Sequence, residues 1–134
     1  MLFHGTRANP PWKIYQSEDG FDMRYSRNGA WGCGTYFAEN AGYSHDYAHV
    51  PSWRSNPSSR QMFTATVLTG NSIDMFPDKG LRRPPVRIPA TCTEPEVLYD
   101  SVTGMAHSGS IPTRIYVLYK FDMAYPSYLV TYST

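Results

Sequence analysis

The sequence predicts an α+β domain dominated by antiparallel β-sheet. Three strand candidates near the C-terminus, residues 98–102, 115–119 and 128–132, are separated by connections of a length that suits antiparallel neighbours. No helical pattern of about ten residues lies between them, although a parallel βαβ sheet would need one. The segment 61–69 adds the clearest strand, because its apolar side chains alternate with threonines.

The N-terminal segment predicts a strand followed by a short helix. Residues 2–4 are strand-like and end at Gly5, a residue type that interrupts regular structure. Pro10 and Pro11 suit the first turn of a helix, where no amide donor is needed. We expect this helix to run to Tyr15.

The next part of the chain predicts a glycine-rich loop, a strand and a helix. Residues 21–34 show no sustained period, so we expect a flexible loop in a position to lie over a bound ligand. A strand is expected over residues 35–38. Asn40 is a good N-cap for a helix over residues 41–48, before a stop at Pro51.

The second half of the chain is expected to alternate connections and strands. Residues 70–95 are punctuated by prolines and show no strong period, which predicts a long loop of the kind used for function or partner contact. Residues 104–112 and 120–126 are the short connections between the C-terminal strands. Neither an internal repeat nor a shift in composition is visible, so we expect one domain over residues 1–134.

The composition excludes several classes of function. With 41% hydrophobic and 17% charged residues the chain is not expected to be disordered, and its net charge of +1 argues against phosphate-backbone binding as a primary role. Cys33 and Cys92 lack the spacing of a zinc site and favour a reducing compartment. No apolar run approaches the roughly 20 residues that cross a membrane, and no signal peptide follows Met1. We therefore expect an intracellular protein, cytoplasmic or nuclear, that does not bind membranes.

Two segments supply the parts of a pocket for a flat ring that bears an amide. They are LFHGT at residues 2–6 and GCGTYFAENAGYSHDYA at residues 32–48. Tyrosine faces stack on a planar ligand, and a carboxamide needs one acceptor and one donor. Ser44 and Tyr47 are three positions apart and so lie on one helical face. The ligand that fits is nicotinamide, which makes NAD the natural candidate, although each residue alone is more commonly structural.

Seven segments carry a family resemblance when they are taken in order. They are LFHGT, GFDMR, WGCGTYFAENAGYSHDYA, QMFTATVLTG, LYDSV, RIYVLY and YPSYLVTY. In this order they resemble the catalytic domain of the poly(ADP-ribose) polymerase family, the diphtheria-toxin-like ADP-ribosyltransferases, and specifically its mono-ADP-ribosylating branch. The resemblance implies a split, mainly antiparallel sheet of the ADP-ribosyltransferase type with short helices. Compared with the family, we expect this chain to lack the usual N-terminal segment and the helical regulatory domain.

The resemblance also implies that NAD is the co-substrate and which residues bind it. His4 would hydrogen-bond a ribose hydroxyl, and the main chain of Gly5 would hold the carboxamide of nicotinamide. Ser44 would add a second hydrogen bond to that carboxamide, while Tyr36 and Tyr47 would stack on the two faces of the ring. No metal is implied.

Four further positions complete the implied NAD-binding set. Thr6 would face the adenosine side, and Arg24 would lie near the adenosine or the diphosphate. Phe37 and Ala38 follow Tyr36 in the same motif and are carried over with it.

The implied catalytic positions are His4, Tyr36 and Ile115. Polymerising members of the family carry a glutamate at the position of Ile115, where a carboxylate can act as base toward an acceptor sugar. An isoleucine removes that group, which implies transfer of one ADP-ribose unit from NAD to a protein acceptor, possibly the chain itself, with a nucleic-acid acceptor left open. The alternative is a catalytically silent module that binds NAD, ADP-ribose or a protein partner. From the residues alone, Ile115 is a β-branched core residue.

Two other site hypotheses are weaker. His45 and His49 are spaced as on a metal-binding helix, but the pattern is not HExxH and no third ligand is evident, so a solvent-facing helix is favoured. Asp100 and Ser101 suggest a hydrolase, yet no GxSxG motif accompanies them. We expect them to fix their strand and the neighbouring loop.

Overall fold

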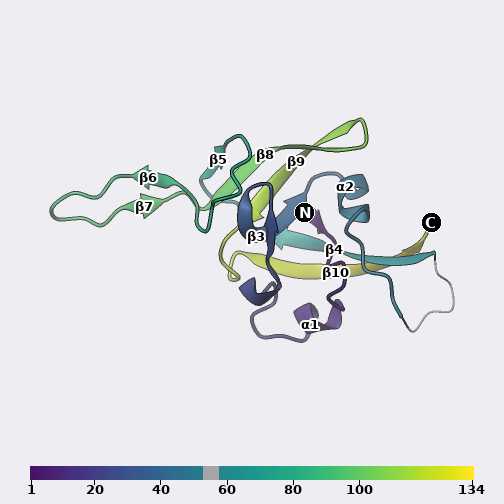
Figure 1. Ribbon diagram of the computed structural model, residues 1–134. Helices are drawn as coiled ribbons and strands as arrows, with labels where there is room; N and C mark the ends of the chain where they lie inside the picture. The colour runs from purple at the N-terminus through teal and green to yellow at the C-terminus, as the bar shows by residue number, and fades with distance from the viewer. Residues whose placement is uncertain (53–57) are drawn as a thin grey trace.

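A computed structural model describes residues 1–52 and 58–134. Figure 1 shows a body built around one large sheet, with short helices beside it and a hairpin that projects from one side. The elements in chain order are β1 (Leu2–His4), α1 (Trp12–Tyr15), η1 (Met23–Tyr25), β2 (Arg27–Gly29), β3 (Gly32–Ala38), α2 (Ala41–His45), β4 (Ser59–Val67), β5 (Ser72–Asp74), β6 (Val86–Ile88), β7 (Val97–Leu98), β8 (Ser101–Ser108), β9 (Ile111–Leu118) and β10 (Ala124–Ser133).

The strand order in the main sheet is β10-β4-β1-β3-β9-β8-β5, and β2 pairs with β3 beside this path. Among the described strands of this sheet, every neighbouring pair is antiparallel apart from β5 and β8. The predicted α+β class with a mainly antiparallel sheet is therefore confirmed. β1 and β3 share only the residue pair Phe3 and Ala38, so the two halves of the sheet diverge directly after it.

Two hydrophobic cores are organised by the alternation of side chains along β3. Phe37 belongs to the first core, and its neighbour Ala38 belongs to the second, because successive residues of a strand point to opposite faces. The first core consists of Ile14, Phe21, Phe37, Phe63, Ala65 and Leu118. The second consists of Trp31, Ala38, Val102, Ile115 and Val117.

The predicted helix after Asn40 exists but is shorter than expected. The Asn40 side chain accepts a hydrogen bond of 2.8 Å from the amide of Gly42, which confirms the N-cap. The helix ends at His45 rather than at residue 48, because the chain turns toward β4. There the main chains of His49 and Gln61 exchange two hydrogen bonds.

Several segments expected to be loops contain short strands. Residues 21–34 include η1 and β2, and residues 70–95 include β5 and β6. The expected connection over 104–112 is a continuous hairpin instead, with β8 and β9 joined by a turn at Gly109, whose φ is +60°. The short strands β2, β5 and β6 carry no sequence period of their own and form because a neighbouring strand offers hydrogen bonds.

The hairpin of β6 and β7 extends away from the body (Figure 1). Near its base the carbonyl of Leu81 accepts a 3.0 Å hydrogen bond from the amide of Cys33 at the start of β3. Asp100 and Ser101 hold the other side of this base, where Asp100 accepts from the amide of Asn71 at 2.7 Å and Ser101 donates to the carbonyl of Thr69 at 2.7 Å. Their expected role in fixing strand and loop is confirmed.

No helix in the described ranges is long and apolar enough to span a bilayer.

Replacing Phe63 with alanine tests the first core. Phe63 is 1% exposed and packs edge-on against Phe21 with ring centroids 5.7 Å apart, so Phe63→Ala is expected to lower the free energy of unfolding by about 3–5 kcal/mol. Phe76 is 91% exposed, and the matched control Phe76→Ala is expected to stay within about 0.5 kcal/mol of wild type. Urea unfolding followed by circular dichroism measures both. Equal losses in the two variants would contradict this core assignment.

Candidate functional site

A cavity of about 260 Å³ opens where β1 and β3 diverge. β1 contributes His4, β3 contributes Tyr36, and α2 with the turn after it contributes Ser44 and Tyr47. The complete lining is His4, Gly5, Arg7, Tyr25, Arg27, Asn28, Gly29, Ala30, Gly34, Thr35, Tyr36, Ala38, Tyr43, Ser44 and Tyr47. Six of the sequence-predicted site residues are thus brought together, namely His4, Gly5, Tyr36, Ala38, Ser44 and Tyr47.

His4 is held as a neutral imidazole with one nitrogen available. Its Nδ1 donates a 2.7 Å hydrogen bond to the carbonyl oxygen of Tyr36, which fixes the tautomer because a carbonyl only accepts. Its ring packs against Phe21 and Phe37 at centroid distances of 5.1 Å and 5.3 Å. This burial lowers the pKa of His4 to about 4, against the opposing effect of the hydrogen bond to Tyr36 and with a smaller contribution from the charge of Arg27. Nε2 is therefore a hydrogen-bond acceptor at neutral pH.

Gly5 allows the end of β1 to approach the end of α2. A Cβ at this position would collide with the main chain of Tyr47 and would lie 2.7 Å from the carbonyl oxygen of Ser44. Only glycine permits this contact, and Gly5 is among the residues that line the cavity. The neighbouring Ser44 side chain is buried and lines the same cavity.

Tyr36 fixes the turn between β2 and β3. Its hydroxyl accepts a 2.8 Å hydrogen bond from the amide of Trp31 and donates one of 2.8 Å to the carbonyl of Gly32. Gly29 lies so close that a Cβ there would be 2.7 Å from the phenol ring. Burial raises the pKa of Tyr36, which keeps the phenol protonated. The ring is consequently a rigid wall of the cavity.

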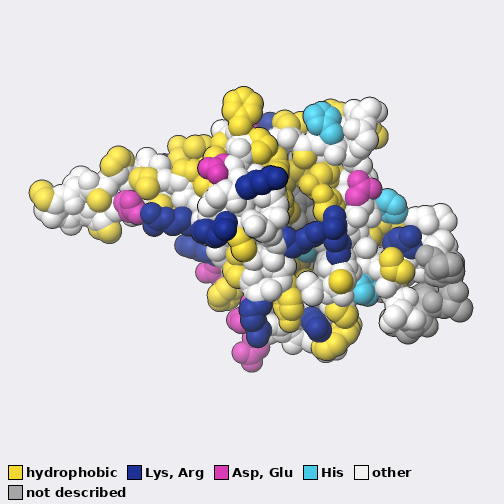
Figure 2. All heavy atoms as spheres, viewed as in Figure 1, with side chains coloured by type: hydrophobic (Ala, Val, Ile, Leu, Met, Phe, Trp, Pro, Cys, Tyr) yellow, Lys and Arg dark blue, Asp and Glu magenta, His cyan; other side chains and the backbone are white. Residues whose placement is uncertain are grey.

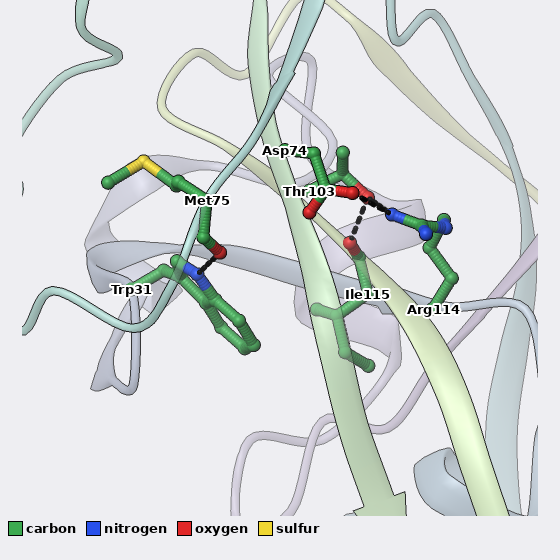
Figure 3. Close-up of polar contacts among 6 residues, drawn as sticks. All are labelled: Trp31, Asp74, Met75, Thr103, Arg114 and Ile115. Atoms are coloured by element: carbon green, nitrogen blue, oxygen red, sulfur yellow. Dashed lines mark hydrogen bonds and ion pairs between the residues drawn. The ribbon is translucent and has the colours of Figure 1, made fainter.

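Polar contacts keep β8, β9 and the Trp31 ring in place (Figure 3). Thr103 donates to the carbonyl of Ile115 at 2.8 Å, and Arg114 donates to both Thr103 at 3.2 Å and Asp74 at 3.3 Å. Trp31 donates from its indole nitrogen to the carbonyl of Met75 at 3.1 Å.

Four sequence-predicted site residues lie outside the cavity lining. Phe37 is 1% exposed in the first core, because the pleat of β3 points it away from Tyr36. Ile115 is fully buried in the second core opposite Ala38, which agrees with the structural interpretation of this residue. Thr6 is buried with no partner for its hydroxyl among the described residues, and Arg24 is exposed and paired with Asp22 at 2.8 Å. Their expected contacts with NAD stay predictions.

The lining contains residues that the sequence did not single out. Arg7 follows the LFHGT segment directly, and Tyr25 and Arg27 lie in the loop that was expected to cover a ligand. Tyr43 packs against Tyr47 with ring centroids 5.2 Å apart. The feature of the sequence that could have indicated these residues as part of the site is their position next to the motifs.

The two histidines with metal-like spacing contact different partners. His45 Nδ1 lies 2.8 Å from the hydroxyl of Tyr132, whereas His49 Nδ1 donates to the carbonyl of Arg7 at 2.6 Å. In the part of the chain that the structure describes, no group of three or more His, Cys, Asp or Glu side chains is arranged to hold a metal ion.

Comparisons with known proteins point in one direction. The family model of the poly(ADP-ribose) polymerase catalytic domain matches residues 1–134. A probable poly [ADP-ribose] polymerase of Dictyostelium discoideum is 38% identical over 133 residues, which cover 98% of this chain and 33% of that protein. Protein mono-ADP-ribosyltransferase PARP12 of Mus musculus is 38% identical over 136 residues, covering 100% of this chain and 17% of that protein. Human protein mono-ADP-ribosyltransferase PARP14 is 34% identical over 98% of this chain and 7% of its own length. The chain therefore spans a third or less of these relatives.

The buried, neutral state of His4 makes stability depend on pH. An unfolded histidine takes up a proton near pH 6.5, whereas the folded His4 does so only near its pKa of about 4. The contribution of His4 to the free energy of unfolding is fully present above pH 6.5. It is lost as the pH falls toward 4, by roughly 3 kcal/mol in total. Urea unfolding of wild type is expected to show this extra loss relative to His4→Gln, whose amide does not titrate. Parallel losses in both proteins would show that His4 is not held neutral.

Proposed function

The chain belongs to the poly(ADP-ribose) polymerase catalytic-domain family, and from that premise we propose that it is an NAD-dependent mono-ADP-ribosyltransferase. It would transfer one ADP-ribose unit from NAD to a macromolecular acceptor and release nicotinamide. The observation that carries the proposal is the convergence of neutral His4, Gly5 and the buried Ser44 on one cavity.

The donor and acceptor atoms of the cavity suit a nicotinamide carboxamide. Its amide nitrogen donates and its oxygen accepts, and the main chain of Gly5 together with the hydroxyl of Ser44 offers both complements. The rigid ring of Tyr36 supplies an apolar face for the pyridine, whereas the guanidinium groups of Arg7 and Arg27 lie over the Tyr47 ring. A cavity of about 260 Å³ lies just below the range of roughly 300–1,000 Å³ typical for larger ligands, so it suits the ring and its ribose rather than a whole dinucleotide.

His4 has the chemistry to orient the ribose. Its Nε2 is an acceptor at neutral pH and therefore takes a hydrogen bond from a ribose hydroxyl without bringing a positive charge near the reacting carbon. Holding the ring and the ribose by separate groups favours stretching of the bond between them toward an oxocarbenium-like state. That bond breaks with its electron pair on the departing nicotinamide. An acceptor nucleophile then bonds to the ribose carbon, and its proton passes to a base of the acceptor or to solvent.

Transfer of a single unit is supported by the kinds of acidic and basic side chains at the cavity. Ile115 is fully buried in the second core, and none of the described lining residues is Asp or Glu. Elongation of an ADP-ribose chain needs a base toward the hydroxyl of an acceptor sugar, and the described lining offers no carboxylate to serve as one. The same observation favours the second candidate function, a module that binds NAD or ADP-ribose without turnover.

The acceptor is proposed to be a protein that meets the β6–β7 hairpin. The base of this hairpin is hydrogen-bonded to β3 beside the cavity, and its strands expose Val86, Ile88 and Val97. The chain itself is a second acceptor to be tested, and a nucleic-acid end a third. We further propose that the reaction takes place in the cytoplasm or nucleus, and the free cysteines Cys33 and Cys92 support this.

Turnover tests the enzyme proposal directly. The chain is incubated with a cell extract and NAD labelled in its adenylate half, and nicotinamide release and label transfer are measured. His4→Ala and Tyr36→Ala are each expected to reduce both signals by roughly 100-fold or more, because the ring and ribose lose their alignment. His107 is exposed on β8 outside the cavity, so His107→Ala is the matched control with unchanged activity. If wild type and both variants release nicotinamide at one background rate, the enzyme proposal is wrong. NAD binding by calorimetry in that case would favour the silent module.

The product distribution tests the single-unit transfer. Mass spectrometry of the modified residues is expected to find one ADP-ribose per site, because no carboxylate lines the described cavity. A ladder of longer chains on one residue would contradict the assignment.

A further inference from the structure

Trp31 is the residue at which three separate segments of the chain meet. It lies in the turn between β2 and β3, and its side chain is buried in the second core. Its amide donates to the hydroxyl of Tyr36, and its indole nitrogen donates to the carbonyl of Met75. Its own carbonyl accepts a 2.6 Å hydrogen bond from the hydroxyl of Tyr119. Both main-chain polar groups of Trp31 are therefore bonded to tyrosine hydroxyls.

The turn that contains Trp31 forms part of the cavity wall. Gly29 and Ala30, which come directly before Trp31, line the cavity together with Tyr36. Among the described strands β2 pairs with β3 alone, and a ribbon of two strands is only marginally stable by itself. The position of this wall consequently depends on contacts that hold the turn from outside.

Two of these contacts come from the segment that leads to the β6–β7 hairpin. The carbonyl of Met75 accepts from the Trp31 indole at 3.1 Å. The carbonyl of Leu81 accepts from the amide of Cys33, directly after the turn, at 3.0 Å. Figure 2 shows the hairpin as an arm that stands clear of the body, so its contacts with the turn lie at its base. Residues 75–81 contain no strand and therefore fix the turn only from one side, from outside the main sheet.

Tyr119 holds the turn from the main sheet itself. It directly follows β9, which pairs with both β3 and β8, and its ring packs against the second core. A Cβ on Gly34 of β3 would lie 3.3 Å from this ring, so the ring lies directly against the strand. Burial, and next the neighbouring phenol of Tyr36, raise the pKa of Tyr119, which keeps on its hydroxyl the proton that it donates. The bond to Trp31 is thus a fixed connection between β9 and the cavity wall.

We propose that Tyr119 is a positioning residue for the transfer reaction and acts through Trp31 on the Tyr36 wall of the cavity. This inference rests on the proposed function, in which the Tyr36 ring aligns the nicotinamide ring. Tyr119 is not among the residues that line the described cavity, so its effect passes through the turn. Its hydroxyl fixes the carbonyl of Trp31, and the amide of the same residue fixes the hydroxyl of Tyr36. Misplacing an aligned group by about 1 Å costs up to roughly 100-fold in rate, so a small movement of this wall affects turnover.

Removal of one hydroxyl tests this role. Tyr119→Phe keeps the ring against the second core and loses the hydrogen bond to Trp31. It is expected to lower the rate of nicotinamide release from saturating NAD by roughly tenfold, and to accelerate amide hydrogen exchange over residues 29–32. Tyr132→Phe is the matched control, because its hydroxyl lies 2.8 Å from His45 Nδ1 on β10, outside the cavity lining. In the control, both quantities are expected to stay within about twofold of wild type.

A double-mutant cycle separates positioning from a general loss of stability. Tyr36→Phe keeps the ring face and loses the hydroxyl that bonds to the turn. If Tyr119 acts through the turn, adding Tyr119→Phe to Tyr36→Phe is expected to lower nicotinamide release by less than about twofold further. Residues that act independently give losses that multiply.

Three results would overturn the positioning role. They are equal turnover in Tyr119→Phe and Tyr132→Phe, losses that multiply in the double variant, and unchanged hydrogen exchange over residues 29–32 in Tyr119→Phe. The exchange measurement needs no turnover, so it tests the contact between Tyr119 and the turn in any case. Wild type that releases no nicotinamide would instead overturn the proposed function on which the inference rests.

Discussion

The hydrogen bond from His4 to the carbonyl of Tyr36 is the contact on which the site depends. β1 and β3 share one residue pair, and beyond it the carbonyl of Tyr36 has no strand partner from β1. The imidazole of His4 bonds to this carbonyl in place of a strand. It thereby links β1 and β3 across the cavity, at a separation too large for their main chains to pair. The same bond uses the proton on Nδ1, so Nε2 is left as the acceptor that faces a ligand.

Several layers of the fold support this contact. The Phe21 and Phe37 rings of the first core surround the His4 imidazole. On the other face of β3, a Cβ on Gly104 would collide with the Trp31 ring. The amide of Trp31 donates a hydrogen bond to the Tyr36 hydroxyl. The polar residues of the cavity are thereby held from both faces of one strand, which is how a site becomes rigid before a ligand arrives.

The sequence was most informative where a local pattern and the fold agree. The first strand, the Asn40 cap and the strand after residue 58 follow from local residue types, and the paired segments around His4 and Tyr36 indicated the cavity. Short elements such as β2 and β6 escaped prediction, because their residues lack a period and adopt strand geometry only beside a partner. Arg24 and Arg27 show the same limit within one loop. The Asp22 side chain, two positions away, pairs with Arg24, whereas β2 pairing directs Arg27 to Tyr47, a contact that the local sequence does not indicate.

The way in which the projecting β6–β7 hairpin is attached to the body has a mechanical consequence. A two-stranded ribbon is only marginally stable by itself and takes its orientation from whatever holds its base. Here that base meets β3 through the bond between Leu81 and Cys33, three positions along the strand from Tyr36. Because Asp100 and Ser101 hold the other side of the base, a force on the hairpin is transmitted through this bond to the strand that forms the cavity wall.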